Sequence, residues 1–195
     1  MKKICLSLGL ASALLLTGCA SYQSNSLSAL DPTYVRNYPE IDGVMIGCKA
    51  YTKDECYRYL DRDVLAKGYQ PIQLTFQNTT DKHYIFSTNE ISIPCASPEE
   101  VADSVHTSTA GRVVGYTLIG MLIPAVVDGV KSSNANAALD RDFYAKAREH
   151  FIIPPKAFVK TLIFVPKAQF APIFDISLLE EETGQHKTIG LSVVR

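Results

Sequence analysis

Alternating apolar and polar residues predict short β-strands in both halves of the chain. The clearest example spans 69–78, where the two kinds alternate along six positions: Ile72, Gln73, Leu74, Thr75, Phe76 and Gln77. A period of two is typical of a strand with one face in a core and the other in water. Shorter apolar segments at 41–51, 83–87 and 90–93 predict three more strands. The segments 158–165, 173–179 and 189–193 predict another three, of which the last two form a hairpin.

Two regions instead have the period of a helix. Thr52 and Glu55 form a capping-box pattern, and Cys56, Leu60 and Val64 follow four residues apart, so we expect a helix there that ends near Gly68. Residues 97–150 are helical in character throughout. They begin with Ser97-Pro98-Glu99-Glu100, a cap followed by proline at the first helical position, and end in a predicted helix at 134–150 with a stripe of Ala135, Leu139, Phe143 and Ala147.

Six or seven short strands around a helical stretch predict an α+β fold. We expect one antiparallel β-sandwich domain at 41–195, interrupted by a helical insertion at 97–150. Strand number and pattern resemble the immunoglobulin-like class, although the chain has no tryptophan and lacks the Cys…Trp…Cys spacing of true immunoglobulin domains. An insertion longer than about 15 residues is usually functional or disordered, and this one is too apolar for disorder.

Residues 113–127 form an uncharged apolar run inside the insertion. As a helix the run would be about 22 Å long, shorter than the roughly 30 Å hydrocarbon core of a bilayer. An apolar helix must be covered, either by its own sheet or by a partner chain or the membrane leaflet, and the sequence leaves both alternatives open. If it serves interaction, the candidate residues are Gly111, Gly115, Tyr116, Leu118, Ile119, Met121, Leu122 and Pro124.

The N-terminus has the pattern of an export signal. Lys2 and Lys3 precede an aliphatic run, and Leu16-Thr17-Gly18-Cys19 follows it. This arrangement resembles the lipobox of bacterial lipoprotein precursors. The resemblance implies cleavage after residue 18 and lipid attachment to Cys19. Since no aspartate follows Cys19, it also implies an outer-membrane location, with the protein on the periplasmic side.

Composition then limits the partners. Loss of residues 1–18 removes Lys2 and Lys3 and lowers the basic count from 19 to 17 against 20 acidic residues, a formal charge of −3. Without basic clusters, this charge argues against nucleic acid as a partner and against general attraction to anionic headgroups. Residues 19–40 are polar and rich in serine, and they predict a lipidated tether in front of the domain.

Three cysteines remain in the mature domain, and an oxidising compartment favours pairing of two of them. We expect a disulfide between Cys48 and Cys56, which are closest in sequence. Pairing of Cys95 with one of them, or three free thiols, are the alternatives.

No motif predicts catalysis. The four histidines are dispersed, and hydroxyl residues near His106 lack a nucleophile elbow or an acid placed by spacing, so we assign no catalytic residue, metal ligand or cofactor. We expect a non-catalytic outer-membrane lipoprotein that docks another envelope protein through its apolar insertion. A membrane-active or lipid-handling protein is the second hypothesis, and a hydrolase-type enzyme the third.

Overall fold

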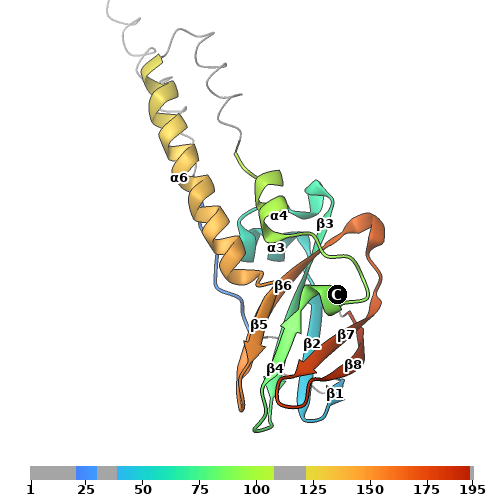
Figure 1. Cartoon of the computed structure of the whole chain (residues 1–195). Helices are drawn as coiled ribbons and strands as arrows, with labels where there is room; N and C mark the ends of the chain where they lie inside the picture. Colours follow the sequence, from blue (N-terminus) through green and yellow to red (C-terminus); the bar gives the residue numbers. More distant parts are fainter. Residues whose placement is uncertain (1–20, 30–38, 108–121, 194–195) are drawn as a thin grey trace, which may run out of the picture. The chain divides into compact units, whose positions relative to one another are not determined.

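The computed structural model describes residues 21–29, 39–107 and 122–193, and for 122–132 it describes the backbone alone. The chain divides into two compact units. Unit 1 comprises residues 1–22 and 107–137, and unit 2 comprises residues 23–106 and 138–195. Both four-stranded sheets lie in unit 2, so the fold is an α+β sandwich (Figure 1).

All strand pairs are antiparallel. The first sheet has the order β1-β2-β3-β6, with β1 at Glu40–Ile41, β2 at Val44–Ala50, β3 at Tyr69–Asn78 and β6 at Phe158–Pro166. The second has the order β5-β4-β7-β8, with β5 at His150–Ile153, β4 at Tyr84–Ser87, β7 at Ile173–Glu180 and β8 at Gln185–Ser192. The predicted C-terminal hairpin is confirmed by the β7–β8 pairing.

Three α-helices and three 3₁₀ turns connect the described strands. The helices are α3 at Lys53–Leu60, α4 at Pro98–Ser104 and α6 at Leu122–Lys146, and the 3₁₀ turns are Leu65–Lys67, Thr88–Glu90 and Lys167–Gln169. Both predicted N-caps form. Thr52 and Glu55 make the complete capping box of α3, and the Ser97 hydroxyl accepts from the Glu100 amide at the start of α4.

The main core lies between the two sheets. The inward side chains of β2 and β3, among them Ile46, Leu74 and Phe76, pack against Phe86 of β4 and Phe151 of β5. The three phenylalanine rings are 4.9 to 5.9 Å apart between centroids, which is the range of favourable aromatic contacts.

The outer face of the first sheet, predicted to be wet, is covered. Gln73 and Thr75 of β3 are each only 1% exposed. A second apolar layer lies on this side, in which Phe143 of α6 stacks on Phe164 of β6 with centroids 5.6 Å apart. The alternation in the sequence predicts the strand. It does not predict that residues far away in the chain bury the polar face of that strand.

A two-residue turn joins β1 to β2. Asp42 and Gly43 have φ angles of 47° and 83°, and positive values at both positions are what a type I′ hairpin turn requires. A Cβ at Gly43 would lie 2.6 Å from Thr80 Cγ2. Glycine is therefore needed here both for its backbone conformation and for its size.

Several predicted boundaries were wrong. Helix α3 ends at Leu60 because Asp61 adopts a left-handed conformation (φ 51°), and Gly68 caps only the following 3₁₀ turn. The predicted strand at 90–93 is reduced to one bridge between Ile91 and Ile176. Helix α6 stops at Lys146, and a short connection leads to strand β5 at His150–Ile153, which the sequence did not indicate.

Strand β6 is an edge strand of its sheet, although its apolar residues are as continuous as those of a central strand. Leu162, Ile163, Phe164 and Val165 are nevertheless buried, and another segment of the protein covers this edge. The Ala96 amide donates to the Phe164 carbonyl at 2.8 Å, and the Thr161 hydroxyl bonds the backbone at the end of α6. A covered edge therefore has the same apolar pattern as a central strand.

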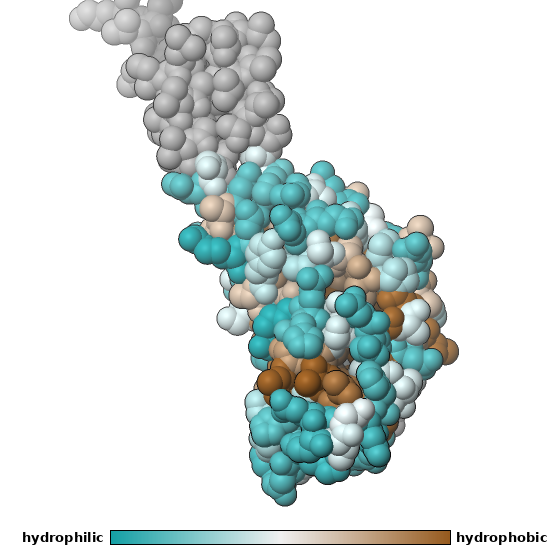
Figure 2. Space-filling model, viewed as in Figure 1, coloured by the Kyte–Doolittle hydropathy of each residue, from teal (hydrophilic) through white to brown (hydrophobic). Residues whose placement is uncertain are grey.

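Most of the predicted apolar run lies outside the described residues. Of its candidate interaction residues, only Leu122 and Pro124 fall within a described element, α6, and only their backbone is described. Within the described part of the chain, no helix is both long and apolar enough to cross a bilayer. Figure 2 shows mainly hydrophilic residues on the visible face of the sandwich, with a smaller hydrophobic area in its lower half.

Candidate functional site

The N-terminal segment at 23–28 is bound along the surface of unit 2. Seven hydrogen bonds join it to α3, β3, β6, α6 and the residue after α3. At its start, the Gln23 amide donates to Asp61 Oδ2 at 3.0 Å, and the Asn25 amide donates to the Arg58 carbonyl at 3.0 Å. Residues 23–28 of the predicted tether are thus docked on the domain.

The far end of the segment satisfies a buried amide on β3. Gln73 Nε2 donates to the Ser28 carbonyl at 2.9 Å, while Gln73 Oε1 accepts from the Tyr51 hydroxyl at 2.7 Å. Burial raises the pKa of Tyr51, so its hydroxyl remains a donor. Since buried amides are costly without partners, docking of the segment removes an energetic penalty from the sheet.

Lys146 joins the segment to the end of α6. Its side chain is buried, and its ammonium donates to Ser24 Oγ, the Tyr59 carbonyl and Asp142 Oδ2 at 2.6 to 2.7 Å. The Ser24 hydroxyl in turn donates to Asp142 Oδ2 at 2.8 Å. All three ammonium protons have an acceptor, so the charge is buried at low cost.

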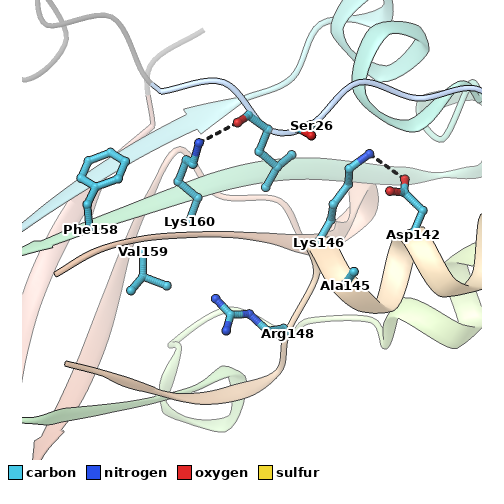
Figure 3. Close-up of a pocket in the computed structure, with 9 residues that line it drawn as sticks. Ser26, Asp142, Ala145, Lys146, Arg148, Phe158, Val159 and Lys160 are labelled. Carbon is cyan, nitrogen blue, oxygen red and sulfur yellow. Dashed lines mark hydrogen bonds and ion pairs between the residues drawn. The ribbon is translucent and has the colours of Figure 1, made fainter.

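A pocket of about 430 Å³ lies beside this network. Its described lining comes from the N-terminal segment, from the end of α6 with the residues that follow it, and from the start of β6: Ser26, Leu27, Asp142, Ala145, Lys146, Arg148, Phe158, Val159 and Lys160. Figure 3 shows Lys146 bonded to Asp142, and the Arg148 guanidinium lying between Val159 and Ala145 in this view.

The described lining of the pocket carries an excess of positive charge. Lys146 neutralises Asp142, which leaves Arg148 and Lys160. Lys160 Nζ donates to the Leu27 carbonyl at 2.7 Å, one bond for a group with three protons. The Arg148 guanidinium lies 4.5 Å from the centroid of the Phe151 ring, a cation–π contact that leaves its N–H groups available. The pocket therefore combines two cations with the apolar side chains of Leu27, Phe158 and Val159.

A second polar group joins α4 to α6. His106 Nε2 lies 2.6 Å from Asp140 Oδ1, and His106 Nδ1 lies 3.5 Å from Asp103 Oδ1. Ligand atoms from these three residues lie within 4.8 Å of one another, and among the described residues this is the arrangement that could hold a metal ion. The same geometry fits polar contacts of one imidazole with two carboxylates, which need no metal.

Unit 1 contains a second contact between the same two regions of the chain, made by Thr107, which directly follows His106. Asn136 Oδ1 accepts from the Thr107 amide at 3.1 Å, and Asn136 Nδ2 donates to the Thr107 carbonyl at 3.4 Å. This pair of bonds brings the two ends of the 107–136 stretch together. The sequence does not predict this contact, because Thr107 and Asn136 are 29 positions apart.

The three cysteines described by the structure are free thiols. Cys48 belongs to the core between the sheets, whereas Cys56 on α3 lies outside that core, so the predicted Cys48–Cys56 disulfide is not formed here. Burial raises the pKa of Cys48, Cys56 and Cys95 to about 12, so each thiol stays protonated near neutral pH.

Sequence reasoning missed the docked segment. Nothing in the sequence predicts the contact between Lys146 and Ser24, which lie 122 positions apart. Cys19, Gly111, Gly115 and the other apolar candidates up to Met121 lie outside the described residues. No protein-family model matches the chain, and a comparison with curated proteins gave no match.

Proposed function

We propose that this protein is a non-catalytic lipoprotein of the bacterial outer membrane. Cys19 carries the lipid, unit 2 faces the periplasm, and the apolar insertion docks another protein of an envelope assembly. The lipobox pattern at 16–19 is the basis of the anchor, as set out from the sequence.

The observation that carries the proposal is the docked N-terminal segment. A slack tether would let the domain sample a large volume, whereas this segment is part of the folded unit from Gln23 onward. Only four residue steps separate Cys19 from Gln23, and an extended chain covers at most about 3.5 Å per step, or about 14 Å here. Such a short link suits a protein that works directly at the membrane surface.

The docking part of the proposal is supported by the base of the insertion. The Thr107–Asn136 bonds in unit 1 and the His106–Asp140 contact in unit 2 hold the chain where it enters and leaves the apolar stretch. Fixed ends reduce the entropy lost when such a stretch binds a partner.

We also propose that the sandwich has immunoglobulin-like topology. If β2, β3, β4, β6, β7 and β8 correspond to strands A, B, C, E, F and G, the sheets become A-B-E and C-F-G, with β5 added beside C as strand C′. On this assignment the helical insertion lies between strands C and C′.

Membrane fractionation tests the anchor. We expect the native chain in the outer-membrane fraction and the Cys19→Ala variant outside the mature lipoprotein pool, without the mass added by acyl chains. A Cys19→Ala variant that keeps the same mass increment and the same fractionation would contradict the anchor.

Substitution within the apolar run tests docking. Leu118→Lys should abolish co-purification of the envelope partner and leave the melting temperature of the domain unchanged. Lys67→Gln, at an exposed lysine of unit 2, is the control. A large fall in melting temperature would mean that the domain itself covers the run, and full retention of the partner would remove the run from the interface.

A further inference from the structure

We propose that the pocket beside the N-terminal segment binds the phosphate group of an anionic membrane lipid, with Arg148 and Lys160 as its ligands. Both line the pocket. Lys160 donates one hydrogen bond to the segment and Arg148 contacts the Phe151 ring, so N–H groups of both side chains can still donate to a ligand. A phosphate offers acceptor oxygens to the planar guanidinium and to the ammonium together, and charge-assisted bonds of this kind are the strong ones.

The remaining lining suits a lipid better than a free ion. Leu27 and Val159 are only partly buried, and the Phe158 side chain is 50% exposed although it is large and apolar. These residues would contact the glycerol and upper acyl carbons that follow a lipid phosphate. Asp142, the only acid among the described lining residues, is held by Lys146 and Ser24 and adds little repulsion.

The position of the pocket relative to the anchor adds a third argument, which rests on the proposed lipidation. Ser26 and Leu27 line the pocket, and they belong to the docked segment whose first bonded residue lies within about 14 Å of Cys19. An anchored domain therefore keeps this pocket close to the lipid headgroups. High local concentration makes even a weak headgroup site effective.

The charge of the whole mature chain agrees with a local site. With 17 basic and 20 acidic residues, the chain has no general attraction to an anionic surface. Recognition of an anionic lipid must then come from a local cluster of positive charges. The electrostatic attraction of such a cluster acts only over about one Debye length, roughly 8–10 Å.

Vesicle binding by a chain without its lipid tests the site separately from the anchor. The probe is a chain that begins at position 19 and carries Cys19→Ala, mixed with vesicles of phosphatidylcholine alone or of phosphatidylcholine and phosphatidylglycerol in equal amounts. We expect sedimentation with the anionic vesicles only. Arg148→Gln and Lys160→Gln should each weaken binding about fivefold, the usual contribution of one basic residue at an anionic surface.

Two further variants make the result specific. Arg141→Gln removes an exposed arginine of α6 that does not line the pocket, and this variant should bind as the parent does. Arg148→Lys keeps the charge and should retain most of the binding. Melting curves identify any variant that loses binding because it is misfolded. If Arg148→Gln is misfolded, the binding of the Arg148→Lys chain shows whether a positive charge at this position is enough.

Three outcomes would overturn the proposal. The first is equal binding to both kinds of vesicle, and the second is binding that neither Arg148→Gln nor Lys160→Gln changes. The third is no vesicle binding while inorganic phosphate shifts the amide resonances of the pocket, which would make it a site for a soluble anion. None of these outcomes bears on Cys19 lipidation, which the fractionation experiment decides.

Discussion

Lys146 should contribute more to stability than any other lysine of the folded unit, and Lys146→Met is the sharpest test of the docked segment. Methionine keeps the length and apolar stem of the side chain but removes the charge. The loss leaves the Tyr59 carbonyl and Asp142 without their ammonium partner and cuts the link to Ser24.

The magnitude follows from burial and from the kind of bond. Hydrogen bonds to charged groups contribute about 1.5–3 kcal/mol each, and breaking a fully buried ion pair costs about 3–5 kcal/mol. Lys146 is 8% exposed, but the Asp142 side chain is 25% exposed, so water recovers part of the loss. We therefore expect a decrease of about 3 kcal/mol in the free energy of unfolding.

Urea denaturation of the Cys19→Ala chain measures the change, and an unchanged m-value would show that the unfolded state is unaffected. Lys67→Met at an exposed position should change stability by less than about 0.5 kcal/mol. Hydrogen exchange adds a local readout, because the amides of Gln23 and Asn25 should lose protection. A loss below about 1 kcal/mol, with both amides still protected, would refute the role given to Lys146.

Three other predictions concern the fold. Gly43→Ala should cost about 1–3 kcal/mol in thermal or urea unfolding, since a Cβ would clash with Thr80 and φ is positive. Although burial raises the pKa of Glu55, hydrogen bonds from Lys49 and Thr52 lower it overall. Its contribution to stability is thus present above pH 4.5 and is lost as the pH falls through the lower folded pKa. Glu55→Gln should therefore make the urea midpoint depend less on pH below 4.5. Alkylation at pH 8 followed by mass spectrometry should add no label to the native protein and three after unfolding, whereas a single label would show a disulfide.

Features encoded by neighbouring residues could be predicted from the sequence. The capping box of α3, the cap of α4, the long strand β3 and the C-terminal hairpin all depend on residues within a few positions of one another. Their physical causes, a hydroxyl near free amides or a period of two, operate locally. These features are confirmed.

Features that depend on distant residues could not be predicted. The polar face of β3 carries Gln73, and only the contact with Ser28, 45 positions away, makes it a buried residue. Strand β5 has four residues, too few for a period to be recognised, and it exists because β4 offers it a partner. The candidate pocket is of the same kind, since its lining comes from three separate stretches of the chain.

The pocket and the docked segment depend on each other, and this dependence can be measured. Ser26 and Leu27 form part of the lining only while the segment is in place, and Lys146 holds the segment through Ser24 without being needed as a ligand. Lys146→Met should therefore weaken binding to anionic vesicles even though Arg148 and Lys160 are intact. Lys146→Met also removes the partner of Asp142 and lowers the positive charge of the lining. Ser24→Ala leaves every charge in the pocket unchanged, so it should reproduce only the part of the loss that comes through the segment. If Ser24→Ala releases the segment, as hydrogen exchange would show, and vesicle binding persists, the two cations act without the segment and the pocket is not the unit of recognition.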